Sequence, residues 1–273
     1  MDIIIDIFRY DFMVKALIVS VSLAIVIPCI AMVVVFKRLS MTGDALSHSS
    51  LAGVAIGLVF QFSPILGSII ACLLAAVFIE LIRKKMKQYA DLAIALVMST
   101  SVALAGIFTP FIKKATNLHS FLFGSIVAIS DIEFYSIIIM SAFIFIIFIL
   151  FYKELFYITY DDESARLAGV RVNAINIMFT FLTALTISIA ARTVGTLIVS
   201  SFIVVPVACA MQVANSYKST LIASILFAIC FSVIGLIITN IYPLGVGSTM
   251  VLVGIVTLIL IVAVKMIVKG IRR

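Results

Sequence analysis

The stretch Ala16–Phe36, ALIVSVSLAIVIPCIAMVVVF, runs for 21 residues without a charged side chain. A helix that crosses a bilayer needs about 20 consecutive apolar residues, and this stretch meets that length. Hydrophobic residues make up 64% of the 273-residue chain and charged residues only 11%, whereas soluble domains carry about 25% charged residues. The sequence therefore predicts an all-α polytopic membrane protein, embedded in the lipid bilayer, and leaves no room for a soluble catalytic or nucleic-acid-binding domain.

Eight further apolar runs follow the first one, separated by short polar breaks. The nine candidate spans are Ala16–Phe36, Asp44–Phe60, Pro64–Ile82, Ala90–Thr109, Phe134–Phe151, Ala174–Ala190, Gly195–Ala214, Thr220–Asn240 and Gly247–Val268. No soluble linker divides them, so residues 1–273 are predicted to form a single transmembrane domain with about eight or nine membrane-spanning helices. The N-terminus lacks the basic start of a signal peptide, and the first span is expected to be retained.

Lysine and arginine residues predict how the chain is oriented, because they concentrate on the cytoplasmic side of membrane proteins. If the loop before Met41 is inside, that side collects 14 of the 19 basic residues, namely Lys37, Arg38, Arg83, Lys84, Lys85, Lys87, Lys153, Arg166, Arg171, Lys218, Lys265, Lys269, Arg272 and Arg273. The N-terminus is then outside and the C-terminus cytoplasmic, as an odd number of spans requires. The net charge of +7 is explained by these loops rather than by a nucleic-acid partner.

The second span begins with the chain's most unusual pair of residues, Asp44 and His48. A spacing of four places both side chains on one helical face. An acidic residue inside a span costs roughly 2.5–3.5 kcal/mol and indicates a functional site. Oxygen and imidazole together suit zinc or manganese. The alternative is that Asp44 lies in the first helical turn, stabilised by the helix N-terminus, with His48 paired to it.

Other polar residues have two interpretations each. Ser49, Gly53 and Gly57 repeat every four residues, a pattern typical of close helix packing. His119, in an outer loop, is either a metal ligand or a solvated side chain. Asp131 and Glu133 flank the outer start of the fifth span, where they either stabilise a helix N-terminus or form a vestibule that attracts cations and contacts an extracellular partner.

Two segments do not read as simple spans. Phe121–Ser130 is apolar but about half a span long, which favours an interfacial or re-entrant segment on the outer side. The polar stretch Tyr160–Asn173 predicts a short inner helix, with Asp161, Asp162 and Glu163 in its first turn, Arg166 after them and Gly169 at its end. Leu167 and Val170 give this helix a small apolar side. It is either a docking element for a soluble partner or a solvated loop helix.

The sequence contains none of the motifs HExxH, GxSxG or GxxxxGK[ST]. The chain is therefore not expected to be an enzyme, and it cannot hydrolyse ATP alone. Uphill transport would need an ion gradient or a separate ATPase. Two rival interpretations remain: a gradient-driven cation carrier or channel that acts alone, and an intramembrane metalloenzyme, for which the sequence offers no third ligand or general base.

Five blocks of sequence, in order, resemble the membrane-spanning permease subunits of bacterial zinc/manganese ABC importers. The blocks are FKRLSMTGDALSHSSLAGVAIG, LFGSIVAIS, DDESARLAGVRV, VGTLIVSSFIVVPVACAMQVA and YPLGVGSTMVLV. The resemblance implies a fold similar to vitamin B12-type (type II) importer permeases, in the bacterial inner or plasma membrane. It also implies a homodimer, two cytoplasmic ATP-binding subunits that hold the ATP, and an extracellular or periplasmic metal-binding protein.

The resemblance also assigns residues. Asp44 and His48 fall on the family's polar pair in the metal path, Ala165–Gly169 falls on the coupling helix that docks into the ATPase, and Pro206 falls on the proline of the fourth block. The form HSSLAG resembles the zinc members, whereas manganese members more often have SHAVLPG there. The expected cargo is therefore Zn²⁺, with Mn²⁺ or Fe²⁺ as alternatives and no permanently bound cofactor. Ser125 departs from the Asp of some zinc members, which leaves Asp131 as a candidate substitute.

Overall fold

The computed structural model describes residues 11–86, 89–112, 122, 124, 130–196, 198–242 and 244–271. Its helices are α2 (Asp11–Phe36), α3 (Ser40–Val59), α4 (Pro64–Lys85), α5 (Ala90–Phe108), the 3-10 turn η2 (Thr109–Phe111), α7 (Asp131–Leu150), α8 (Tyr152–Tyr160), α9 (Asp162–Leu167), α10 (Val172–Thr193), α11 (Val199–Val213), α12 (Tyr217–Ile241) and α13 (Val246–Ile271). The described ranges contain no strand. Each of the nine predicted spans corresponds to one helix, with ends that differ by a few residues.

Seven of the described helices are long and apolar enough to cross a membrane, namely α2, α4, α5 with η2, α7, α10, α12 and α13. The other two predicted spans, α3 and α11, fall outside this set. The α3 helix carries Asp44, His48 and several serines, and α11 has only 15 residues. Both pack inside the bundle, α3 against α4, α5, α10 and α11, and α11 against α2, α12 and α13. The predicted count of eight or nine membrane-spanning helices is therefore not confirmed.

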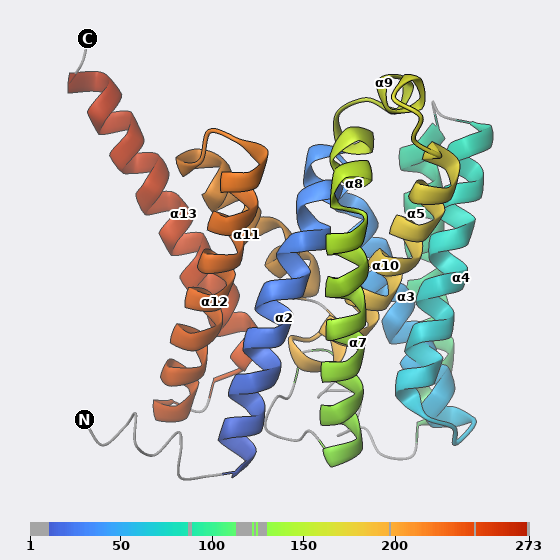
Figure 1. The fold of residues 1–273 in the computed structure, drawn as a ribbon. Helices are drawn as coiled ribbons and strands as arrows, with labels where there is room; N and C mark the ends of the chain where they lie inside the picture. The colour runs from blue at the N-terminus through green and yellow to red at the C-terminus, as the bar shows by residue number, and fades with distance from the viewer. Residues whose placement is uncertain are drawn as a thin grey trace.

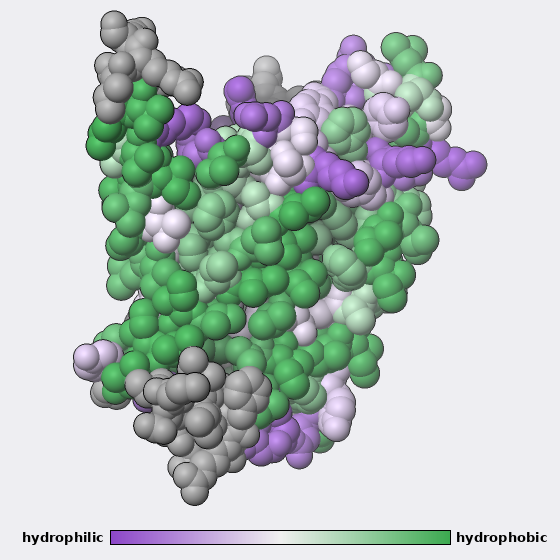
Figure 2. Space-filling view, turned by 60° about the vertical axis from the view of Figure 1, so that its left-hand side comes forward, coloured by the Kyte–Doolittle hydropathy of each residue, from purple (hydrophilic) through white to green (hydrophobic). Residues whose placement is uncertain are grey.

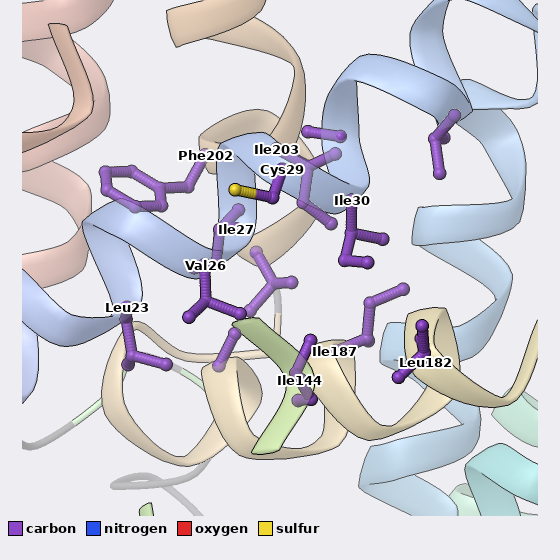
Figure 3. Packing of buried hydrophobic residues seen from close by; sticks show 14 of the residues in the cluster. Leu23, Val26, Ile27, Cys29, Ile30, Ile144, Leu182, Ile187, Phe202 and Ile203 are labelled. Carbon is purple, nitrogen blue, oxygen red and sulfur yellow. The ribbon is translucent and has the colours of Figure 1, made fainter. Parts of the chain in front are cut away.

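The core forms around α2 and α10, the two long helices with the largest buried share. Both are surrounded by other helices; α2 is almost wholly apolar, whereas α10 also buries polar residues such as Asn176, Thr183 and Ser188. Figure 3 shows how side chains from four helices meet there: Leu23, Val26, Ile27, Cys29 and Ile30 from α2, Ile144 from α7, Leu182 and Ile187 from α10, and Phe202 and Ile203 from α11. This packing fixes the positions of α10 and α11, two of the helices that pack against α3.

The surface has the pattern expected of a protein in lipid. Large apolar side chains point outward along the outer helices, for example Leu74, Ile139 and Ile259, each more than 60% exposed. Figure 2 shows the resulting apolar band, with hydrophilic residues gathered above and below it. Such a band is the lipid-facing surface of a membrane protein, because lipid tails surround the helices there in place of water.

The two ends of the bundle differ in their connections. Figure 1 places α9, the start of α3 and the last turns of α4 at one end, here called the α9 end, and the starts of α2 and α7 at the opposite end. Helix α13 slants away from the bundle and finishes at the α9 end. The helix α8 was not predicted; it arises because the chain bends at Phe151 (φ −104°, ψ 20°) where α7 ends.

Candidate functional site

Helix α3 presents Asp44 and His48 on its one partly open side. Between Gly43 and Ala55, every residue of α3 is buried except Asp44, His48 and Leu51. These three lie at spacings of four and three residues, so they form one stripe along the helix, here called the open stripe of α3. The helix begins at Ser40, and Asp44 therefore lies beyond its first turn, where no acidic residue is found. The interpretation of Asp44 as a first-turn cap is wrong.

Asp44 and His48 have no partner within the described part of the chain. Neither makes a hydrogen bond or an ion pair there, not even with the other. Among the described residues, no group of three His, Cys, Asp or Glu side chains is close enough to hold a metal ion. A single chain thus offers two candidate ligands on a half-buried stripe, where the loss of hydration is not compensated by pairing.

Buried hydroxyl groups fix how α3 is rotated. Ser50 Oγ lies 2.7 Å from Ser68 Oγ on α4, which lies 2.7 Å from Ser188 Oγ on α10. On another side of α3, Ser49 Oγ lies 2.7 Å from Ser101 Oγ on α5. Hydroxyl pairs of this kind hold membrane helices together. Because Ser50 is held from α4 and Ser49 from α5, the stripe with Asp44 and His48 is left facing outward.

The residues predicted as a packing stripe lie against α4 and α5. A Cβ added to Gly53 would lie 2.2 Å from the Gly67 carbonyl oxygen, and a Cβ added to Gly67 would lie 2.3 Å from the Gly53 carbonyl oxygen. The two helices therefore cross backbone to backbone at these glycines. Gly57 lies near the start of α4, where an added Cβ would approach Pro64 Cα to 3.0 Å. The close crossing positions α3 without bulky side chains.

Helix α9 is short and sharply bounded at both ends. Asp161 is its N-cap, and its carboxylate accepts hydrogen bonds from the backbone N–H groups of Glu163 and Ser164. The Ser164 hydroxyl, the Ser164 amide and the Glu163 amide all lower the pKa of Asp161, in that order of importance. At the other end Gly169 has φ +84° and donates to the Arg166 carbonyl, while Val170 donates to the Ala165 carbonyl. This is a Schellman motif, which favours glycine at that position.

The outward side of α9 is available to another molecule. Ala165 is fully buried, whereas Glu163 and Arg166 are exposed and Leu167 is 91% exposed. The predicted apolar side is therefore divided, because Val170 is half-buried against the bundle while Leu167 points away from it. A small helix with a projecting leucine between charged residues is a suitable contact surface for a soluble protein.

At the opposite end, the predicted vestibule residues are engaged by other charges. Asp131 pairs with Lys15 at 2.7 Å, and Arg192 donates to both Glu133 carboxylate oxygens at 3.0 and 3.2 Å. Glu133 also completes a capping box with Ser130 at the start of α7. Arg192 lies in the last turn of α10. His119 and most of Phe121–Ser130, including Ser125, lie outside the described residues.

Sequence reasoning did not find the contact between Lys37 and α9. Lys37 Nζ donates to Asp162 Oδ1 at 3.3 Å and to Asn176 Oδ1 at 2.9 Å. These residues are separated by 125 and 139 positions in the chain. Asn176, a buried amide near the start of a span, was the one available signal, because a buried polar group in a membrane helix requires a partner.

These features define a polytopic membrane protein that has a polar pair on the open side of one helix and an exposed short helix at one end. The model of the family described as the ABC 3 transport family matches residues 9–266. The chain belongs to the ABC 3 transport family.

Several known proteins are similar to this chain. A protein of Treponema pallidum named a probable metal transport system membrane protein is 33% identical, covering 93% of this chain and 96% of the relative. The manganese transport system membrane protein MntC of Listeria monocytogenes is 31% identical, covering 90% and 88%. The high-affinity zinc uptake system membrane protein ZnuB of Haemophilus influenzae is 25% identical, covering 89% and 94%.

A solved structure has the same arrangement of helices. PsaBC from Streptococcus pneumoniae, in complex with a Fab, matches with a TM-score of 0.85 and 29% identity, covering 95% of this chain and 94% of that one. Family and fold agree with the predicted membrane permease. The prediction of a zinc type in particular is not confirmed, because similar proteins carry names for manganese as well as zinc.

Proposed function

We propose that this chain is the permease subunit of an ATP-driven importer for divalent metal ions, and that it works as a homodimer with two cytoplasmic ATP-binding subunits and an extracellular metal-binding protein. The observation that carries the proposal is the open stripe of α3, where Asp44 and His48 lie half-buried and unpartnered. In a membrane segment such residues face a water-filled path or a polar partner. The open stripe of a second copy would supply polar partners, and the space between the two stripes would form the path.

The metal passes between the two open stripes. Each copy contributes one carboxylate and one imidazole, so two copies together offer the four ligands that a divalent transition metal accepts. The ligands hold the ion weakly, because a pathway must release what it binds. A single chain lacks a third ligand among its described residues, which makes the second copy part of the site.

The ATP-binding subunits, which supply the energy for transport, bind at the α9 end. This end is proposed to be cytoplasmic because most basic residues are predicted on that side. The exposed Arg166 and Leu167 contact the ATP-binding subunit. ATP closes the pair of ATP-binding subunits, α9 follows their movement, and the access to the metal path alternates. The extracellular binding protein docks at the opposite end, near the start of α7. There the vestibule is proposed to include His119, Asp131 and Glu133.

The proposed cargo is Zn²⁺, supported by the zinc-like sequence HSSLAG from His48 to Gly53. Mn²⁺ is a second candidate, favoured by the 31% identity to a relative named for manganese transport. Fe²⁺ is a third possibility within the same ligand chemistry. Nitrogen and oxygen ligands accept all three ions, so the choice among them depends on measured competition.

The test is uptake of radioactive Zn²⁺ and Mn²⁺, in competition, into vesicles that hold this chain with and without the ATP-binding subunit and the binding protein. The importer requires all three components and ATP. Asp44→Asn with His48→Gln preserves size and polarity but weakens both ligands, and uptake should fall to background. Asp91→Asn, which changes an exposed acid of α5, is the matched control and should leave uptake unchanged.

Two results would contradict the proposal. Full uptake by the Asp44→Asn/His48→Gln variant would remove the site assignment. Metal flux through vesicles that contain this chain alone, without ATP, would make it a gradient-driven carrier or channel. For the docking surface, Leu167→Asp should prevent copurification of the ATP-binding subunit, whereas Lys218→Asp, an exposed change on α12 at the same end, should not.

A further inference from the structure

We infer that Lys37 is the positioning residue that passes the movement of α9 to α3, the helix that carries Asp44 and His48. The inference rests on the proposed function and adds a physical link between its two sites. Lys37 lies in the turn between α2 and α3, seven residues before Asp44, and its ammonium group binds Asp162 in α9.

The contact joins the α2–α3 turn to two neighbouring helices, α9 and α10, whose contacting residues follow Lys37 by 125 and 139 positions. Lys37 Nζ bridges Asp162 Oδ1 at 3.3 Å and Asn176 Oδ1 at 2.9 Å, and Asn176 Nδ2 donates to Asp162 Oδ2 at 3.4 Å. The Lys37 side chain is only 10% exposed. A charged group with so little hydration depends on its protein partners. The Lys37–Asp162–Asn176 cluster therefore keeps the α2–α3 turn, α9 and the start of α10 together.

Electrostatics at the cluster agrees with the burial. Burial lowers the pKa of Lys37 and the Asp162 carboxylate opposes that shift, while Arg83 lowers it further and Glu80 raises it. Removing Asp162 would thus leave an ammonium group with the lone amide oxygen of Asn176 as its hydrogen-bond acceptor. Losing either Lys37 or Asp162 would destabilise the cluster, because the remaining charge would have no opposite charge beside it.

The turn that contains Lys37 is strained and leads directly into α3. Arg38 has φ +58°, in the left-handed region that side chains other than glycine rarely adopt. Arg38 donates to the Val35 carbonyl and Leu39 to the Val34 carbonyl, so α2 ends in a Schellman motif and α3 starts at Ser40. Strained backbone of this kind gathers at switch regions. A pull on Lys37 acts on this turn and hence on the first turns of α3.

A second contact attaches the chain just before α9 to the same turn. Phe36, the residue before Lys37, lies 6.2 Å from Tyr160 and 5.8 Å from Tyr217, measured between ring centroids. Phe156 of α8 stacks edge-on against Tyr217 at 5.0 Å. The rings hold α8 beside the end of α2 by packing alone. Within the described residues, the ion pair between Lys37 and Asp162 is the one charged contact that joins α9 itself to this turn.

The experiment uses the chain together with its ATP-binding subunit and binding protein in liposomes. Metal uptake and ATP hydrolysis are measured in the same vesicles, with whichever of Zn²⁺ and Mn²⁺ the unmodified chain transports. Lys37→Met removes the ammonium group and keeps the side chain's length, and Asp162→Asn removes the opposite charge. Lys153→Met is the matched control, because Lys153 is exposed on α8 at the same end and forms no ion pair among the described residues.

The expected result is a loss of coupling without a loss of assembly. In Lys37→Met and in Asp162→Asn, the number of metal ions taken up per ATP hydrolysed falls at least tenfold, while the ATP-binding subunit still copurifies. The double variant is no worse than either single one, since both changes break the same contact. Lys37→Arg restores most of the ratio, and Lys153→Met does not change it.

Other results would overturn the inference. An unchanged ratio in both single variants removes the link, and so does a parallel fall in uptake and hydrolysis, which would indicate a purely structural role. If Lys37→Met fails to fold, Asp162→Asn decides, because the Asp162 side chain is 47% exposed. Failure of the proposed function is distinguishable, because then the unmodified chain itself shows no ATP-dependent uptake.

Discussion

Replacing Gly53 by Ala tests the idea that α3 is positioned by a backbone crossing with α4. The added Cβ would lie 2.2 Å from the Gly67 carbonyl oxygen, 2.6 Å from the Gly67 carbonyl carbon and 2.7 Å from Ala71 Cβ. Since non-bonded carbon atoms pack best at about 3.5–4.0 Å, the two helices must separate by about 1 Å. Two of these contacts are backbone atoms, so no side chain can rotate to relieve them.

The cost of Gly53→Ala follows from that separation. Overpacking of a tight interface costs about 1–3 kcal/mol. A separation of about 1 Å would also break the hydroxyl contact between Ser50 and Ser68, now 2.7 Å, which adds about 0.6 kcal/mol in a membrane. Alanine's helix propensity offsets about 1 kcal/mol of this cost. We therefore expect Gly53→Ala to lower the free energy of unfolding by about 1–3 kcal/mol.

The assay is reversible unfolding in mixed micelles, followed by circular dichroism. Gly106→Ala is the matched control: Gly106 is also within a helix, α5, but an added Cβ meets nothing within 4 Å. The control should be stabilised by about 1 kcal/mol, because alanine loses less conformational entropy in a helix. If Gly53→Ala is as stable as Gly106→Ala, the helices do not cross at Gly53 and the account of how α3 is positioned is refuted.

Further predictions concern three other positions. Gly247→Ala should destabilise the protein by about 1–3 kcal/mol, measured in the same unfolding assay, because an added Cβ would lie 2.0 Å from the Val194 carbonyl oxygen. Arg38→Gly should stabilise it by about 1 kcal/mol, since Arg38 is exposed and has φ +58°; no change would mean that the turn carries no strain. Hydrogen bonds lower the pKa of Asp161 in the folded protein. Asp161 therefore stabilises α9 fully above its unfolded pKa of about 3.9, and this stabilisation is lost as the pH falls through the lower folded pKa. Hydrogen-exchange protection of α9 should decrease in that pH range, and Asp161→Asn should remove the pH dependence.

The length of hydrophobic runs predicted the helices well, because a helix that crosses the hydrocarbon core of a bilayer needs an apolar stretch of nearly fixed length. It failed to separate α3 and α11 from the others. Whether a polar or short helix crosses the membrane depends on neighbours that cover it, and run length contains no information about neighbours. The apolar run ends at Phe151, just before the charged Lys153 and Glu154, but run length did not show that a further helix, α8, follows the bend.

The candidate site shows the same division between local and distant information. The spacing of Asp44 and His48 predicted a shared face, and Gly169 predicted the end of α9, because both follow from the geometry of one helix. The side of α3 that stays open is set by Ser68 on α4 and Ser101 on α5. The contact of Lys37 with Asp162 joins segments 125 residues apart, and nothing in either local sequence indicates the other.

The polarity of α3 has a consequence for how the protein is made. By length and composition α3 is not among the described helices apolar enough to cross a membrane, and the helices that cover it, α4, α5, α10 and α11, all follow it in the chain. Synthesis therefore delivers α3 before any of its protective neighbours except α2. The connection from Val59 to Pro64 is short, and α4 packs against α3, so we expect the two helices to enter the membrane together as a hairpin. The same segment that gives the protein its polar pair makes its insertion dependent on what is synthesised next.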